Sequence, residues 1–266
     1  MTIELTGKLS GSVDAHTPET LAATWDHAYL TLPDEAGDGY IETTPAEILK
    51  TKVDFKCPTV LFAHGSSGVN PAIRELAQWL STEMGAACVV PDSMQTADRL
   101  TYTSPVARQD YERIHAMRSQ ELAFAATQLQ KMPWFDGNYV VAGTSEGGVT
   151  AARFDGNSVG LRESGKMIFS WSCEENYFVD TPGNVFEFNE PVLSVMSLTD
   201  KFFGVGNSYL DNPKAYGYPH EALKDNVNAS IVLLPQAPHT LLNLPQAHGA
   251  IQAFLVRVWL DKYLEE

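Results

Sequence analysis

Residues 139–154 read YVVAGTSEGGVTAARF, and this stretch decides the fold. An apolar run leads into the residues GTSEGG, and a pattern typical of a helix follows at once. The stretch matches G-x-S-x-G, in which a serine occupies a sharp turn between a buried strand and a helix. The match predicts that Ser145 stands exposed at the edge of a sheet, where it can act as a nucleophile.

Glycine is needed on both sides of that serine. Gly143 and Gly147 have no side chains, so the strand can bend sharply and the helix can pack close to it. The strained turn would push the Ser145 hydroxyl outward, and the free N–H groups at the helix start suit a negatively charged oxygen. A glycine-rich turn with an incidental serine is the alternative, and the strand-turn-helix context favours the nucleophile.

Short apolar segments alternate with helical patterns along most of the chain. Segments that are apolar on both faces and separated by helices predict an α/β fold with a mostly parallel central sheet and helices on both faces. The absence of a linker or repeat predicts a single domain over residues 1–266. The expected strands are 27–33, 57–65, 86–93, 137–145, 166–175, 191–200 and 230–239, and the expected helices are 70–85, 104–132, 146–154 and 244–264.

Two segments, 93–104 and 201–229, are too long and irregular to be simple connections, so we expect lids or binding loops there. Aromatic residues gather after two of the predicted strands. They could line an apolar pocket or simply pack the loops onto the sheet, and both interpretations stay open. These residues are Trp171, Tyr177, Phe178, Phe186, Phe188, Phe202, Phe203, Tyr209, Tyr216 and Tyr218.

Composition argues against several classes of protein. The 266 residues carry 33 acidic and 18 basic side chains, a net charge of −15, whereas a nucleic-acid binder needs a basic face. No apolar run reaches the roughly 18 residues that a membrane span requires. The first residues do not resemble a signal peptide, so a cytoplasmic location is expected. Three cysteines without a CxxC pair predict neither a disulfide framework nor a cysteine zinc site.

A serine hydroxyl becomes a good nucleophile only when a base removes its proton. In this architecture the order along the chain is serine, then an acid, then histidine. Asp200 ends the apolar run VLSVMSLTD, and His239 follows the run IVLLPQAP. Because parallel strands end at the same edge of a sheet, we expect Ser145, Asp200 and His239 to meet there.

Other residues compete for these roles. His220 lies in the long loop before the last strand, and His248 lies inside the final helix. Asp180 and Glu174 are alternative acids that follow an earlier strand. Position along the fold favours Asp200 and His239.

The segment FAHGSSG, residues 62–68, is the second anchor of the predicted site. A His-Gly pair at the end of an early strand can supply half of an oxyanion hole. The expected donors are the backbone N–H groups of Glu146 and Ser66, with Ser67 as the alternative to Ser66. His64 is expected to orient this loop and not to act as the base. A simple turn is the other interpretation of HGSSG.

Six stretches, LFAHGSSG, VVPDS, YERIHAMRSQELAFAATQL, VVAGTSEGG, SLTD and PHTLLN, together resemble the α/β-hydrolase superfamily. Within it the chain is most similar to the dienelactone hydrolase family, over about residues 55 to 264. Enzymes of that family carry a cysteine nucleophile, whereas this chain has Ser145. The difference makes dienelactone a doubtful substrate and favours a serine-dependent esterase.

The resemblance implies hydrolysis of a small-molecule ester through an acyl-enzyme, with no metal and no organic cofactor. We expect no nucleic-acid or membrane partner. Two alternatives remain open. The same groups could cleave a thioester or an amide, or the chain could be a ligand-binding relative without catalysis.

Overall fold

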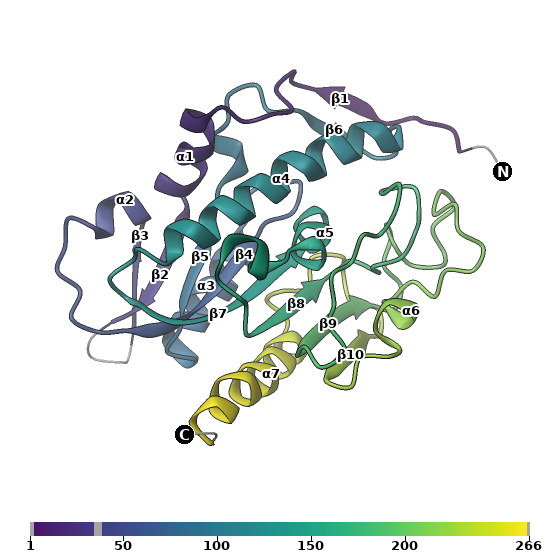
Figure 1. Ribbon diagram of the computed structural model, residues 1–266. Helices are drawn as coiled ribbons and strands as arrows, with labels where there is room; N and C mark the ends of the chain where they lie inside the picture. Colours follow the sequence, from purple (N-terminus) through teal and green to yellow (C-terminus); the bar gives the residue numbers. More distant parts are fainter. Residues whose placement is uncertain (1–2, 35–38, 265–266) are drawn as a thin grey trace.

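A twisted eight-stranded sheet runs through the middle of the protein, as seen in the computed structural model, which describes residues 3–34 and 39–264 (Figure 1). From one edge to the other its strands are β10 (Ala229–Leu234), β9 (Val192–Ser197), β8 (Gly165–Phe169), β7 (Phe135–Thr144), β4 (Cys57–Ala63), β5 (Ala87–Val90), β2 (Tyr29–Pro33) and β3 (Tyr40–Thr43).

The strands β4, β5, β7, β8, β9 and β10 are parallel, which confirms the predicted mostly parallel sheet. Strand β2 is antiparallel to both β5 and β3. Strand β3 is not among the strands expected from the sequence, because its residues Tyr40, Ile41 and Glu42 are exposed and show no apolar alternation. The hairpin of β2 and β3 therefore forms the edge farthest from β10.

Helices cover both faces of the sheet. On one face lie α1 (Pro18–Asp26), α4 (Arg108–Leu129) and α5 (Glu146–Arg153), and on the other lie α3 (Pro71–Glu83) and α7 (Pro245–Leu264). Successive side chains of a strand point to opposite faces. In β4, accordingly, Leu61 packs into the first core and its neighbours Val60 and Phe62 into the second. Two short helices, α2 (Pro45–Ile48) and α6 (His220–Leu223), lie at the periphery.

Helix α3 begins as predicted. Asn70 is its N-cap, with a side-chain oxygen that accepts a hydrogen bond from the N–H of Ile73, and Pro71 occupies the first turn. The predicted start of α4 at a Ser104-Pro105 cap is wrong, because α4 begins at Arg108. The Ser104 hydroxyl instead accepts a hydrogen bond from Tyr111, and the chain before it is the extended strand β6 (Thr101–Thr103), which pairs with β1 (Lys8–Ser10).

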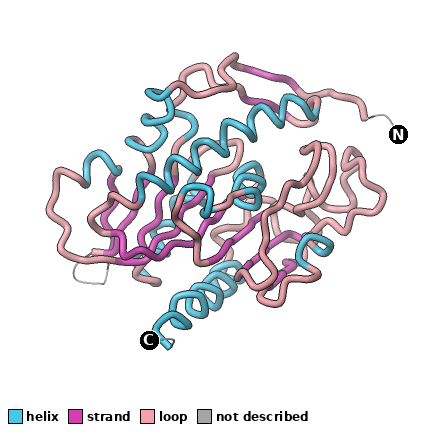
Figure 2. Tube along the Cα trace, in the orientation of Figure 1, coloured by secondary structure: helices cyan, strands magenta, loops and turns pink. Residues whose placement is uncertain are grey.

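The chain between β8 and β10 is mostly loop, and Figure 2 shows these loops gathered on one side of the molecule. Part of the predicted segment 201–229 and part of 93–104 border the pocket described below, and whether either moves as a lid stays a prediction. Among the described residues, no helix is both long and apolar enough to cross a bilayer.

Candidate active site

Ser145 occupies a strained turn between β7 and α5. Its backbone angles are φ 56° and ψ −116°, a conformation with positive φ that L-residues rarely adopt. Its N–H donates to the carbonyl of Phe169 at 2.9 Å. A β-carbon on Gly143 would lie 2.0 Å from the carbonyl oxygen of Gly147, and one on Gly147 would lie 2.0 Å from that of Ala63. Both positions therefore require glycine, as the sequence analysis predicted.

His239 and Asp200 are hydrogen-bonded. The Nδ1 atom of His239 lies 2.7 Å from Oδ2 of Asp200, and the other carboxylate oxygen accepts the N–H groups of Phe202 and Phe203 at 2.9 Å each. An ionised carboxylate can only accept hydrogen bonds, so the proton of the imidazole must sit on Nδ1. This tautomer leaves Nε2 free to take a proton.

The carboxylate of Asp200 is buried, with a side chain that has no exposed surface. Burial acts to raise the pKa of Asp200, but the hydrogen bond and charge of His239 and the two backbone N–H groups outweigh it. The pKa of Asp200 consequently lies below its ordinary value. Asp200 is thus held as an anion beside the imidazole ring.

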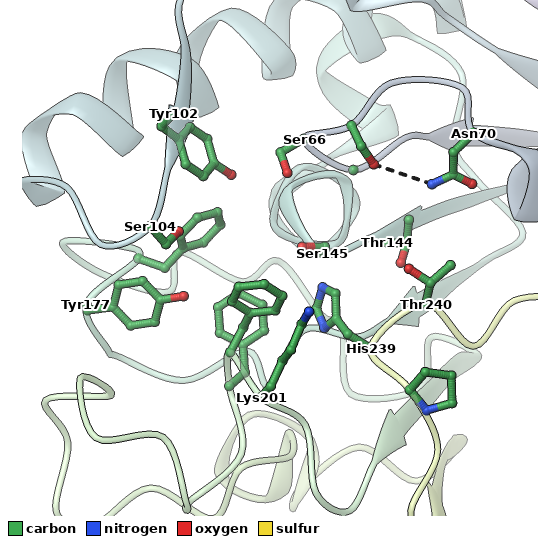
Figure 3. Close-up of a pocket in the computed structure, with 16 residues that line it drawn as sticks. Ser66, Asn70, Tyr102, Ser104, Thr144, Ser145, Tyr177, Lys201, His239 and Thr240 are labelled. Atoms are coloured by element: carbon green, nitrogen blue, oxygen red, sulfur yellow. Dashed lines mark hydrogen bonds between the residues drawn. The ribbon is translucent and has the colours of Figure 1, made fainter. Parts of the chain in front are cut away.

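Ser145 and His239 line the same pocket, which has a volume of about 330 Å³ (Figure 3). Among the described residues no hydrogen bond joins the Ser145 hydroxyl to the His239 ring. Catalytic hydrogen bonds are often long in unliganded enzymes and tighten around the substrate. The remaining lining residues are Gly65, Ser66, Ser67, Asn70, Tyr102, Ser104, Thr144, Tyr177, Phe178, Lys201, Phe202, Phe203, Pro238 and Thr240.

The loop after β4 brings backbone donors to this pocket. Ser66 and Ser67 both line it, and Asn70 donates to the Ser67 hydroxyl at 3.4 Å. The N–H groups of Ser66, Ser67 and Glu146 have no acceptor within the part of the chain that the structure describes. They are therefore available to an oxygen placed beside Ser145, and the choice between Ser66 and Ser67 stays open.

His64 is fully buried behind this loop and does not line the pocket. Its Nδ1 lies 2.6 Å from the carbonyl of Gly65, and its Nε2 accepts the N–H of Ser93 at 3.0 Å. Burial, together with the charge of Arg118, holds the pKa of His64 well below its ordinary value. The ring is neutral with both nitrogens engaged, an arrangement that orients the loop.

A buried ion network that no sequence pattern predicts lies beneath the turn. The side chain of Glu146, directly after Ser145, accepts a hydrogen bond from Arg99 at 2.7 Å and lies 3.5 Å from Arg118. These three charged side chains are at most 2% exposed. Because buried charges need partners, the network fixes the start of α5 against α4 and against residues 93–99.

The same network reaches the N-terminal segment through Glu121. This carboxylate accepts from Arg118 at 2.6 Å and from Ser93 at 2.6 Å, and it lies 2.9 Å from the His16 ring. Burial acts to raise the pKa of Glu121, but Arg118, His16 and Ser93 outweigh it and lower the pKa to about 2. No local sequence pattern signals these contacts, since His16 and Glu121 are 105 residues apart.

The competing candidates lie outside the pocket. His220 is half-buried and packs on the ring of Tyr216, and His248 stacks on Trp79 with ring centroids 4.3 Å apart. The Glu174 carboxylate accepts backbone N–H groups of the 201–229 loop. Asp180 is exposed, and its backbone N–H donates to the Glu112 carboxylate of α4 at 2.9 Å. None of the four lines the pocket that contains Ser145.

Four of the ten aromatic residues singled out in the sequence line this pocket: Tyr177, Phe178, Phe202 and Phe203. Tyr102, Ser104 and Lys201 also line it, and they belong to the segments 93–104 and 201–229, in which lids or binding loops are expected. No local pattern singles out Tyr102, because it belongs to β6, whose partner β1 lies far away in the sequence. Within the described ranges, no group of three or more His, Cys, Asp or Glu side chains is arranged to hold a metal ion.

No protein-family model matches the chain, and no curated protein matches its sequence. Solved structures do match it. Est1E from Butyrivibrio proteoclasticus is 15% identical, with a TM-score of 0.52 over 87% of this chain and 93% of that one. TT1662 from Thermus thermophilus is 18% identical, with a TM-score of 0.57 over 77% of this chain and 90% of that one.

A protein from Klebsiella pneumoniae described as a dienelactone hydrolase is 16% identical, with a TM-score of 0.53 over 78% of this chain and 89% of that one. Together with the sheet order and the turn at Ser145, these similarities confirm the predicted fold. The chain has the α/β-hydrolase fold, and dienelactone hydrolases are among its structural neighbours.

Proposed function

We propose that the protein is a serine hydrolase that cleaves a carboxylic ester through an acyl-enzyme intermediate. One observation carries the proposal. The His239 ring, oriented by the 2.7 Å bond to Asp200, lies in the same pocket as Ser145 on its strained turn. A nucleophile, a base and an acid that orients the base are the parts that acyl transfer requires.

In the first half of the reaction, the Ser145 oxygen bonds to the ester carbonyl carbon while Nε2 of His239 takes the hydroxyl proton of Ser145. Asp200 stabilises the imidazolium that forms. The carbon–oxygen bond to the alcohol then breaks, and His239 gives its proton to the departing alcohol. The acyl group remains on Ser145.

In the second half, His239 takes a proton from water, whose oxygen attacks the acyl carbon. The bond to Ser145 breaks, the serine regains its proton and the acid leaves. In both halves the negative oxygen of the tetrahedral intermediate lies against the N–H groups of Glu146 and Ser66, with Ser67 as the alternative to Ser66. One such donor contributes on the order of 3 kcal/mol to transition-state stabilisation.

The structural neighbours support hydrolysis as the kind of reaction. Esterase PE8 shares the fold at 14% identity and a TM-score of 0.51, and another structure of Est1E has ferulic acid bound. A carboxylic acid is the product that ester cleavage releases. Thioester or amide cleavage would use the same residues, and p-nitrophenyl esters, acyl-coenzyme A compounds and aminoacyl amides assayed side by side would separate the three reactions.

A fluorophosphonate probe tests the mechanism directly, since it labels a serine only when a base activates it. We expect the wild-type protein to be labelled and the Ser145→Ala protein not to be, with kcat for an ester reduced by roughly 10⁶-fold. Ser158→Ala, which removes an exposed serine outside the pocket, is the matched control. Labelling that survives Ser145→Ala, or a loss of only a few-fold, would reject the assignment. A ligand-binding relative without catalysis would show neither labelling nor turnover.

A further inference from the structure

A single buried arginine links the two segments that carry the proposed oxyanion donors. Arg118 of α4 is 2% exposed. Its Nη2 donates to the backbone carbonyl of His64 at 2.8 Å, and its Nε lies 3.5 Å from the carboxylate of Glu146. The loop that begins at His64 and the turn that ends at Glu146 are far apart in the sequence, so the guanidinium is a direct tie between them.

The arginine is itself held from two sides. Its Nη1 donates to the carboxylate of Glu121 at 2.6 Å, and the carboxylate of Glu146 accepts a further bond from Arg99 at 2.7 Å. The side chains of these four residues are at most 2% exposed, so bulk water does not compete for the contacts. The planar fork of a guanidinium can hold several acceptors at once, which the single nitrogen of a lysine cannot do in the same geometry.

His64 passes this constraint on to the next peptide. Its Nδ1 lies 2.6 Å from the carbonyl oxygen of Gly65, which can only accept, so the ring proton sits on Nδ1. Its Nε2 then accepts the N–H of Ser93 at 3.0 Å and lies 3.2 Å from Nη1 of Arg118. Ser93 and Arg118 thereby fix the tautomer in which His64 holds the Gly65 carbonyl.

That hydrogen bond decides which way the following N–H points. In a planar trans peptide, the C=O of Gly65 and the N–H of Ser66 point in opposite directions. His64 lies behind the loop and outside the pocket, so the N–H of Ser66 points toward the pocket, which Gly65 and Ser66 both line (Figure 3). Within the described residues no hydrogen bond holds the carbonyl of Ser66, so the N–H of Ser67 lacks this restraint.

We propose that Arg118 is a positioning residue of the oxyanion hole, which sets the spacing between the N–H groups of Glu146 and Ser66, and that Ser66 and not Ser67 is the second donor. This inference rests on the proposed function and deepens it. Arg118 does not line the pocket of Ser145, so it acts through the two backbone segments that it ties together. Its effect is greatest in the transition state, because both donors are needed when negative charge develops on the carbonyl oxygen.

The first test compares kcat and KM for p-nitrophenyl butanoate in the wild type and in Arg118→Lys. The lysine keeps the charge and loses the fork, so we expect kcat to fall at least about 10-fold with KM little changed. The trifluoromethyl ketone with the same acyl chain adds to the serine and forms an oxyanion, and its Ki should rise by the factor by which kcat/KM falls. A loss of folded enzyme would lower kcat without changing Ki, so the ketone separates positioning from stability.

Arg153→Lys is the matched control. Arg153 of α5 donates to the carboxylate of Glu112 of α4 at 2.8 Å and 3.0 Å, so it joins the same two helices outside the pocket. This variant should leave kcat and Ki unchanged. An Arg118→Lys enzyme with the kcat and Ki of the wild type, or equal changes in the two variants, would overturn the role of Arg118 while esterase activity stands.

Two further variants test the path to Ser66 whether or not Arg118→Lys folds. The N–H of Gly68 donates to the carbonyl of Gly65 at 3.1 Å, which makes Ser66 the second residue of a turn, and its φ is not positive, so proline suits the position. Ser66→Pro should be about 10²- to 10³-fold slower than Ser66→Ala, which also lacks the hydroxyl but keeps the N–H. His64→Gln keeps an acceptor for Arg118 and loses the donor to Gly65, so it should raise the Ki of the ketone at least about 10-fold.

Each result decides a separate point. Ser66→Pro as active as Ser66→Ala would overturn the choice of Ser66, and His64→Gln with an unchanged Ki would overturn the path through Gly65. A wild type that is neither labelled by a fluorophosphonate nor active on esters would overturn the proposed function itself, and this inference with it.

Discussion

The hydroxyl of Ser170 donates a 2.6 Å hydrogen bond to the backbone carbonyl of His239. Ser170 follows β8, is fully buried and has a φ of 52°, which places it in the left-handed region. Ser197, at the end of β9, donates in the same way to the carbonyl of Ala237 at 2.6 Å. Two neighbouring strand ends thus hold the loop that carries the proposed base.

We expect Ser170→Gly to lower kcat for ester hydrolysis about 10-fold, because a loosened His239 loop misplaces the base. Its effect on stability should be small. The lost hydrogen bond and the greater backbone freedom of glycine in the unfolded chain together cost about 2 kcal/mol. Relief of the strain at a positive φ returns about the same 2 kcal/mol.

Enzyme kinetics and urea unfolding of the same preparations would check this. Ser170→Ala loses the bond but keeps the strain, so it should be both slower and less stable than the wild type. A Ser170→Gly enzyme with normal kcat would show that the bond does not position His239.

Replacing the proposed orienting acid should disable the base without unfolding the protein. Asp200→Asn should lower kcat by about 10⁴-fold, since an amide can hold the imidazole in the wrong tautomer. Steady-state kinetics over a pH series would measure the loss. Asp180→Asn, a change at an exposed acid outside the pocket, should leave kcat unchanged. Equal losses in both variants would contradict the special role of Asp200.

The close approach of Gly147 to β4 predicts a large cost for a single methyl group. Gly147→Ala should destabilise the fold by about 3 kcal/mol or more, because its β-carbon would lie 2.0 Å from the backbone of Ala63. Gly249→Ala, at an exposed position in the second turn of α7 with nothing within 4 Å, should instead stabilise the fold by up to about 1 kcal/mol. Urea unfolding would measure both, and similar effects at the two sites would refute the steric argument.

The network beneath the turn predicts a loss of stability in acid. The pKa of Glu121 is about 2 in the folded protein, below the ordinary value of 4.5 expected in the unfolded chain. The ionised carboxylate of Glu121 therefore contributes about 3 kcal/mol to the free energy of unfolding. This contribution is complete above about pH 4.5 and is lost as the pH falls toward 2.

Glu121→Gln should thus lower the free energy of unfolding at pH 7 and flatten its decline between pH 5 and pH 2. Glu47→Gln, at an exposed carboxylate in α2, is the matched control and should leave the curve unchanged. Unfolding by urea at each pH gives the measurement. A wild-type curve and a Glu121→Gln curve of the same shape would exclude this carboxylate as the source of acid sensitivity.

Much of the architecture was predictable because its signals are local. The cap at Asn70, the paired glycines around Ser145 and the apolar strand segments depend on neighbouring residues alone. The alternation of apolar strand segments with helices then implies a parallel sheet, and the carboxyl ends of parallel strands lie at one edge of the sheet. That rule led from chain order alone to Asp200 and His239, which the structure brings together in one hydrogen bond beside the pocket of Ser145.

By itself, the sequence determined the type of fold, the turn at Ser145 and the edge at which the polar residues gather. Only the tertiary structure decided the antiparallel β2–β3 edge, the pairing of Arg99 with Glu146 and the presence of Tyr102 in the pocket. The reason is physical. Periodicity and capping are read over a few neighbouring residues, whereas a buried ion pair or a pocket wall depends on how segments tens of residues apart finally pack.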